Sequence, residues 1–267
     1  MSNEHESMII QDPWHSLKQF TPARIALGRA GMSLSTQACL DFQLAHALAR
    51  DAVNIPLDFA ELEQRLHKCG LQTLTLQSQA ENQRIYLQRP DLGRLLNASA
   101  MISLQNCPTI QTDAVIVVAD GLSSKAIDHH AEPFLSLLVP ELLLKGYRLP
   151  PICLVKHGRV AIGDVIAEHF AARLCIMMIG ERPGLSSPDS MGIYFTYQAK
   201  AGLSTDADRN CISNIHKDGL TYQQALTKLL YLVEESEKLQ LSGVNLKDQT
   251  TDSETNDQQK QLNFLLD

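Results

Sequence analysis

The order of apolar and polar positions predicts alternating strands and helices in the second half of the chain. Residues 114–118 (A-V-I-V-V) and 174–179 (L-C-I-M-M-I) are uninterrupted apolar runs, which are typical of strands buried on both faces. Shorter segments at 152–155 and 193–197 predict two more strands, the second of them more polar. Helical patterns lie between and after these strands, at residues 123–145 (interrupted by Pro133 and Pro140), 162–172 and from Tyr222 through Val233.

This alternation indicates an α/β fold with a Rossmann-like, mostly parallel sheet and helices on both faces. An α-helical N-terminal segment precedes it. A helix at 33–53 is expected to be buried, because Phe42, Ala45 and Ala52 recur at helical spacing. A helix, a strand and a helix that begins after Pro90 are expected next, at residues 58–68, 71–76 and 91–104.

The chain therefore divides into four predicted parts. Residues 1–20 form a flexible lead-in, in which Trp14 is expected to act as a packing anchor. Residues 21–105 form the mainly helical segment, and residues 106–242 form the α/β domain. The polar sequence of residues 243–267 predicts a disordered tail.

Composition excludes several classes of partner. A net charge of −7 argues against nucleic acid, which requires a basic face, and against anionic membrane surfaces. No apolar run approaches the length of a membrane helix, and the N-terminus lacks the apolar core of a signal peptide. The six cysteines contain no C-x-x-C pair. We therefore expect free thiols in a bacterial-type cytoplasm, with no nucleic acid and no membrane as partner.

Candidate chemistry follows two of the predicted strands. Asp120-Gly121-Leu122-Ser123 comes after the first buried strand, and Gly180-Glu181-Arg182-Pro183-Gly184 comes after the second. Ligands of open α/β sheets bind outside the carboxyl ends of the strands, so Asp120, Glu181 and Arg182 are candidates for holding a polar ligand. The alternatives are a turn with a helix cap at Ser123, and a solvated loop at residues 180–184.

Two further groups of residues have an open interpretation. Cys211 and His216 stand five apart in C-I-S-N-I-H, without a second pair to complete a zinc shell. Cys211 is therefore more simply a contact residue than a nucleophile. Asp128, His129, His130 and Glu132 resemble metal ligands, but adjacent histidines on a helix point apart, so a solvated face without a metal is expected.

Several catalytic signatures are missing. The chain has no G-x-G-x-x-G, no P-loop, no G-x-S-x-G and no S-x-x-K, which removes support for dinucleotide, nucleotide and serine-hydrolase sites. It also lacks the D-x-H-x-x-G signature of domains that bind cobalamin with its own base displaced.

Six segments, in their order along the chain, closely resemble the small (light) subunit of ethanolamine ammonia-lyase. They are A-R-I-A-L-G-R-A-G (residues 23–31), Y-L-Q-R-P-D-L-G-R (86–94), D-G-L-S (120–123), G-R-V (158–160), G-E-R-P-G (180–184) and C-I-S-N-I-H (211–216). The resemblance extends from about Thr21 to about Leu239.

The resemblance implies an adenosylcobalamin-dependent enzyme that converts ethanolamine to acetaldehyde and ammonia by radical rearrangement. The cofactor lies between this subunit and a large catalytic subunit in a hetero-oligomeric ring, and it retains its dimethylbenzimidazole (base-on). Substrate residues belong to the large subunit, so this chain contributes cofactor binding from its α/β domain, and no catalytic residue is expected in it. Cofactor contacts are implied at Val160, Glu181 and Cys211, and Arg182, Asp120 and Asn214 are added as neighbours in the same motifs.

One departure from the family and two competing readings remain. Many relatives carry a longer N-terminal segment that serves packaging into a bacterial microcompartment. The segment ahead of the first matching motif is short in this chain, which favours a location in the bacterial cytoplasm over a microcompartment. The competing readings are a self-sufficient α/β enzyme that uses Glu181, Arg182 and Cys211 on a small polar substrate, and a scaffold subunit without enzymatic function.

Overall fold

A six-stranded sheet with the strand order β1-β3-β2-β4-β5-β6 forms the centre of the computed structural model, which describes residues 9–108 and 112–250. Neighbours from β1 to β4 pair in parallel, whereas β4–β5 and β5–β6 are antiparallel. The strands are β1 (Thr73–Gln77), β2 (Ala114–Ala119), β3 (Ile152–Lys156), β4 (Leu174–Gly180), β5 (Met191–Tyr197) and β6 (Arg209–Ile215). The predicted mostly parallel α/β sheet is confirmed.

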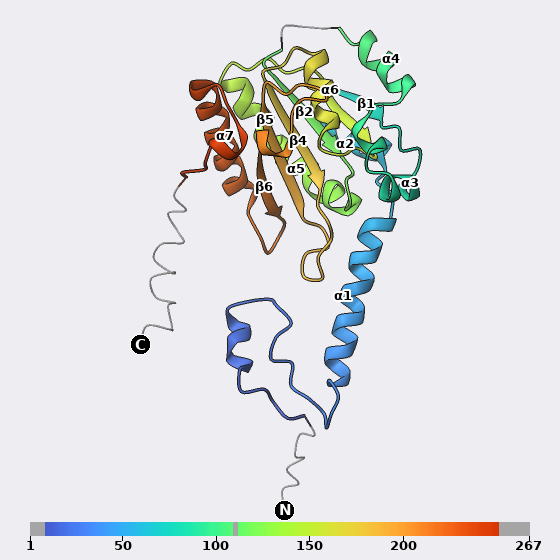
Figure 1. Ribbon diagram of the computed structural model, residues 1–267, viewed down its shortest axis with the longest axis vertical. Helices are drawn as coiled ribbons and strands as arrows, with labels where there is room; N and C mark the ends of the chain where they lie inside the picture. Colours follow the sequence, from blue (N-terminus) through green and yellow to red (C-terminus); the bar gives the residue numbers. More distant parts are fainter. Residues whose placement is uncertain (1–8, 109–111, 251–267) are drawn as a thin grey trace, which may run out of the picture.

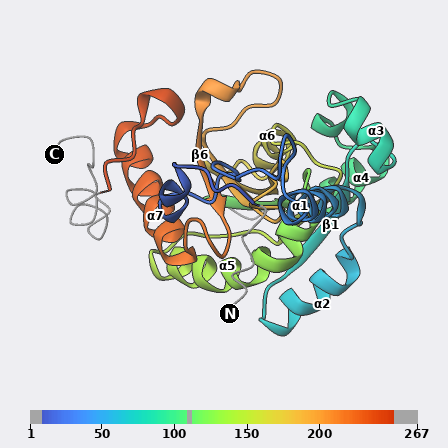
Figure 2. The ribbon, with the colours of Figure 1, turned by 90° about the horizontal axis from the view of Figure 1, so that it is seen from below.

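Helices cover both faces of this sheet (Figure 2). One face packs against α2 (Phe59–Lys68), α5 (Ser124–Leu144) and α7 (Tyr222–Leu239). The other packs against α4 (Ala98–Asn106) and α6 (Ile162–His169). Alternate residues of β4 enter the two cores, Ile176 and Met178 on the α5 side and Cys175 and Met177 on the α6 side. This double burial explains why the strand is apolar throughout.

Helix α1 (Thr36–Asn54) projects from this body toward the N-terminal segment (Figure 1). Only Ala45 and Ala52 are buried, whereas four large apolar side chains are more than two-fifths exposed: Leu40, Phe42, Leu44 and Leu48. The prediction of a buried helix is therefore wrong, because most of α1 extends beyond the sheet. Trp14, expected to be a packing anchor, is 66% exposed.

Two other predicted helices differ in the structure. The segment expected as one helix at 91–104 divides into a 3-10 turn, Leu92–Arg94, and α4. The chain between them is extended, and the Asn97 amide donates to the Gln77 carbonyl at 3.0 Å while its side chain caps α4. Helix α5 passes through Pro133 and Pro140 without the expected interruption. A short helix that was not predicted, α3, covers Gln83–Gln88.

The C-terminal part contains strand β6, which the sequence did not reveal. Part of the predicted disordered tail is ordered against it, because the Asn210 side chain donates to the Leu246 carbonyl at 2.7 Å and Leu246 is buried. Residues 251–267 and 1–8 lie outside the described residues. The division of the chain into four parts stays a prediction. Strand β1, which lies within the segment predicted to be mainly helical (residues 21–105), joins the sheet by pairing with β3. Among the described helices, none combines the length and apolarity that a bilayer span requires.

A buried ion pair joins α6 to β6. The guanidinium of Arg209 donates to both carboxylate oxygens of Asp164, each at 2.7 Å, and to Thr196 Oγ1 at 3.2 Å. The side chains of Arg209 and Asp164 are 4% and 2% exposed. Bidentate geometry offsets part of the desolvation of both charges, so loss of either partner would leave an isolated buried ion.

Arg209→Met is expected to lower the free energy of unfolding by about 3–5 kcal/mol, because Asp164 then stays buried without its counterion. The double variant Asp164→Leu/Arg209→Met should recover most of that loss, since both charges are removed together. Urea unfolding measures the stability of the single and the double variant. Lys238→Met is the control, because Lys238 pairs with Glu235 at the surface and its substitution should cost less than about 1 kcal/mol. A double variant that is no more stable than Arg209→Met would contradict the prediction.

Candidate functional site

The residues that follow β2, β3, β4 and β6 gather at one edge of the sheet. These strands run in the same direction, so Asp120, His157, Glu181 and His216 stand at their carboxyl ends. In Figure 1 this edge faces the N-terminal segment, and Arg24 of that segment donates to the Leu185 carbonyl of the β4–β5 loop at 3.3 Å. The predicted placement of both motif loops at a common edge is confirmed.

The two motif loops touch backbone to backbone. The Leu122 amide donates to the Gly180 carbonyl at 3.0 Å, and Gly121 adopts the left-handed conformation with φ of +65°. A Cβ on Gly121 would lie 2.3 Å from the Gly180 carbonyl oxygen. Ser123 caps α5 by accepting from the Ala126 amide and also donates to the Pro188 carbonyl at 2.8 Å. The reading of D-G-L-S as a turn and helix cap is therefore correct.

Asp120 is buried and holds the β3–α6 loop. Its carboxylate accepts from the amides of Gly121 and His157, each at 3.0 Å. Burial raises the pKa of Asp120 to about 7, although these backbone hydrogen bonds act in the opposite direction. The residue also lines a cavity of about 240 Å³ together with Gln83, Lys156 and His157. Asp120 thus holds the loops at the carboxyl edge of the sheet, and part of its surface borders the cavity.

Glu181 connects the ends of β4 and β6. Its Oε2 accepts from the Ser190 hydroxyl at 2.5 Å and from the Asn214 amide at 3.1 Å. Its Oε1 stands over Gly192, where a Cβ would lie only 2.8 Å away. The side chain is half-buried. Within the described part of the chain, both hydrogen bonds of the carboxylate engage Oε2, and Oε1 has no hydrogen-bond partner.

Asn214 and His216 form a tight loop after β6. Asn214 is exposed and left-handed, with φ of +66°. His216 Nε2 lies 2.9 Å from Asn214 Oδ1, and His216 Nδ1 accepts from the Asp218 amide at 3.3 Å. Both ring nitrogens are therefore occupied within the loop, which is a structural role for this histidine.

Cys211 lies on the outer face of β6, opposite Tyr194 of β5. The residue is exposed, yet enough protein surrounds its sulfur that desolvation raises the pKa of the Cys211 thiol, with a smaller opposing effect from the Tyr194 hydroxyl. Desolvation also raises the pKa of Tyr194, to about 12. The thiol is consequently protonated near neutral pH, whereas a cysteine nucleophile requires a lowered pKa.

Two motifs that are far apart in the sequence fix Val160. The Arg159 guanidinium stacks 4.1 Å from the centre of the Tyr86 ring and donates to the Tyr86 carbonyl at 3.1 Å. The Arg159 amide donates to the Gly93 carbonyl at 2.7 Å, and the Tyr86 hydroxyl donates to the Gly158 carbonyl at 3.2 Å. Val160 is half-buried and packs against the apolar core on the α6 side of the sheet, as does Tyr194.

The six predicted site residues form two pairs, and the other two lie apart. Glu181 and Asn214 are in direct contact, and Val160 and Cys211 share the α6 side of the sheet with Tyr194. Arg182 is exposed in the β4–β5 loop, and Asp120 is buried beneath the edge. Sequence analysis missed Ser190, Tyr194 and the Tyr86–Arg159 stack. Tyr86 and Arg159 lie within motifs that were recognised, whereas no sequence pattern identifies Ser190 or Tyr194.

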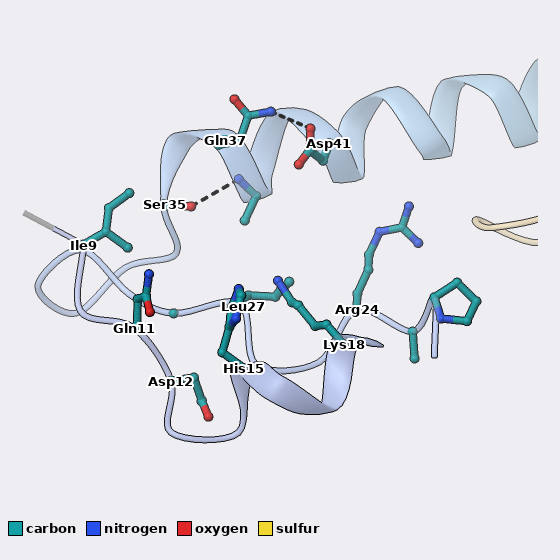
Figure 3. A pocket seen from close by; sticks show the side chains of 14 residues that line it. Ile9, Gln11, Asp12, His15, Lys18, Arg24, Leu27, Ser35, Gln37 and Asp41 are labelled. Atoms are coloured by element: carbon teal, nitrogen blue, oxygen red, sulfur yellow. Dashed lines mark hydrogen bonds between the residues drawn. The ribbon is translucent and has the colours of Figure 1, made fainter. Parts of the chain in front are cut away.

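A separate pocket of about 450 Å³ lies between the N-terminal segment and the start of α1 (Figure 3). Lys18 and Arg24 extend along one side of it, and Gln37 donates to Asp41 at 2.6 Å on the other. None of the six predicted site residues lines this pocket. Sequence analysis gave no signal for it.

Known proteins resemble the chain along nearly its whole length. The family model described as "Ethanolamine ammonia-lyase light chain (EutC)" matches residues 11–247. An ethanolamine ammonia-lyase small subunit of Pseudomonas fluorescens is 52% identical over 264 residues, which covers 96% of this chain and 96% of the relative. That of Pseudomonas syringae pv. tomato is 47% identical over 277 residues, covering 100% and 96%. The chain therefore belongs to the family of ethanolamine ammonia-lyase small subunits.

Proposed function

We propose that this chain supplies one side of an adenosylcobalamin site and that a large catalytic subunit supplies the other. The observation that carries the proposal is the position of Glu181, whose carboxylate is fixed at the carboxyl edge by Ser190 and Asn214 while Oε1 is left available. Ligands of open α/β sheets bind at this edge.

The residues present fit such a cofactor. The corrin ring carries amide side chains, for which Glu181 Oε1 is an acceptor. Val160 and Tyr194 offer a partly apolar surface on the α6 side, and Cys211 offers a neutral thiol beside them. Arg182 and Asn214 are exposed next to Glu181 and can contact polar substituents. Asp120 acts from beneath by holding the neighbouring loop.

When bound, adenosylcobalamin supplies the radical chemistry that converts ethanolamine to acetaldehyde and ammonia. The residues of this chain bind and orient the cofactor and exclude water from one side of it. We assign no catalytic acid or base to them. The base-on state is supported by the absent D-x-H-x-x-G signature and by His216, whose two ring nitrogens are occupied within its own loop.

Dependence on a partner is supported by the surface of α1. Leu40, Phe42, Leu44 and Leu48 are exposed along this projecting helix, and contiguous exposed apolar side chains are typical of interaction surfaces. A hetero-oligomeric ring with the large subunit is the proposed assembly. The bacterial cytoplasm is the proposed location, in agreement with free cysteines throughout the described residues.

The isolated chain is expected to show no ethanolamine lyase activity with added adenosylcobalamin, and addition of the large subunit should restore turnover. The reason is that the edge around Glu181 presents binding groups but no activated nucleophile. Steady-state assays of acetaldehyde formation by each subunit alone and by both together measure this. Turnover by the single chain would favour a self-sufficient enzyme, and equal activity of the large subunit alone would favour a scaffold.

Glu181→Ala is expected to weaken the apparent affinity of the assembled enzyme for cobalamin about tenfold, which corresponds to about 1.4 kcal/mol, the value of one hydrogen bond. Ser190→Ala keeps the carboxylate and removes only one of its supports, so its effect should be smaller. Glu235→Ala, on the distant α7, is the matched control. Equal affinity of the Glu181→Ala enzyme and its parent would refute the contact.

Cys211→Ser is expected to retain substantial turnover, because a thiol whose pKa is raised by desolvation does no thiolate chemistry near neutral pH. The measurement is kcat and KM of the assembled variant, with bound cobalamin quantified from its visible spectrum. A loss of several orders of magnitude in an enzyme that still binds cobalamin would support the self-sufficient reading, in which Cys211 is a nucleophile.

A further inference from the structure

Three potential metal ligands converge on the α5 side of the sheet, away from Val160 and Cys211. One nitrogen each of His129 and His130 and one carboxylate oxygen of Asp189 all lie within 4.8 Å of one another. The histidines belong to α5, and Asp189 belongs to the β4–β5 loop. The two imidazole rings are nearly perpendicular, at 89°, and Asp189 approaches them from a loop outside the helix.

The solvated face expected for these histidines is correct for only one of them. His129 is exposed and pairs with Asp189, its Nδ1 lying 3.2 Å from Oδ2. His130 is only 6% exposed and is packed against Tyr222 of α7, whose hydroxyl lies 2.7 Å from His130 Nδ1. Sequence analysis could not foresee this difference, because it depends on α7 and on the loop.

His130 Nε2 is the decisive atom. It is buried and makes no hydrogen bond of normal geometry in the described part of the chain. Buried polar atoms without a partner are rare in proteins, and a bound ion is one recognised way in which such an atom is satisfied. The Tyr222 hydroxyl can accept a hydrogen bond from Nδ1–H of His130, and in that tautomer Nε2 carries the lone pair, as second-shell hydrogen bonds arrange in metal-binding histidines.

We infer that His129, His130 and Asp189 form a site for a divalent transition-metal ion such as Zn²⁺, with one position open to water. Two imidazoles and one carboxylate suit zinc or a similar ion better than magnesium or calcium, which prefer oxygen ligands alone. Tetrahedral coordination at 2.0–2.2 Å requires ligand atoms roughly 3.3 Å apart. The present spacing therefore needs a closure of about an ångström or a little more, which side-chain rotation of Asp189 and His129 can supply.

The site would fasten the β4–β5 loop to α5. Pro188, next to Asp189, already accepts a hydrogen bond from Ser123 at the start of α5, so the loop reaches the histidines in a fixed register. The same loop begins with Glu181. A metal at this position acts as a structural clamp on that loop, and its existence does not depend on the proposed cofactor function.

The test is metal binding by the purified full-length chain, free of affinity tags and cobalamin. After removal of metals with a chelator, Zn²⁺ binding is measured by equilibrium dialysis with elemental analysis, and Co²⁺ serves as the spectroscopic probe. We expect one ion per chain and a Co²⁺ spectrum without the intense thiolate charge-transfer band that binding to cysteine would produce. A thiolate band in the spectrum, or no stoichiometric binding, would overturn the site.

Variants locate the ion. Asp189→Asn and His129→Gln change side chains that are partly exposed to solvent, so the fold should be preserved. Each should weaken metal binding at least tenfold. Tyr222→Phe, which removes the partner of His130 Nδ1, should weaken it by about ten- to a hundredfold. Asp128→Asn is the control, because it makes the same charge change as Asp189→Asn. Asp128 is next to His129 in the sequence but pairs with Arg65, so this variant should leave the affinity for the metal unchanged. Equal affinity in Asp189→Asn, His129→Gln and the parent would show that these residues hold no ion.

Discussion

The close approach of Gly121 and Gly180 is the constraint on which the functional edge depends. A Cβ on Gly180 would lie 2.0 Å from the Ser123 carbonyl oxygen, and one on Gly121 would lie 2.3 Å from the Gly180 carbonyl oxygen. No side chain can be accommodated at those distances. Because the two backbones meet, the loop after β2 and the loop after β4 hold each other in place, with Ser123 at the start of α5 and Glu181 directly after Gly180.

Two carboxylates at this edge serve different purposes because their surroundings differ. Asp120 is buried and accepts hydrogen bonds from the amides of Gly121 and His157, and its burial raises its pKa to about 7 although these hydrogen bonds oppose the rise. Glu181 is half-buried and uses only Oε2 on its neighbours. The first residue therefore shapes the loop, and the second keeps an acceptor oxygen for a ligand. Sequence alone placed both at strand ends but could not assign these roles.

The sequence predicted those features that local pattern determines. The uninterrupted runs of β2 and β4 identified buried strands, because residues on both of their faces are apolar. Strand β6 was missed because its buried apolar residues, Ile212 and Ile215, are three apart rather than two, where the pairing with β5 shifts register between Met191 and Ile193. Burial of α1 was predicted wrongly because periodicity identifies an apolar stripe but not what covers it.

The open side of the sheet supports the proposal that a second protein completes this site. Helices α4 and α6 cover the strands from β1 to β4 on that side, and the Asp164–Arg209 pair joins α6 to β6. Beyond that pair, the outward side chains of β6, Cys211 and Ser213, are exposed, with Tyr194 half-buried beside them. A large cofactor resting on this surface would be enclosed by the chain on one side only. Exclusion of water from its other side therefore requires a second protein, for which α1 already carries an exposed apolar surface.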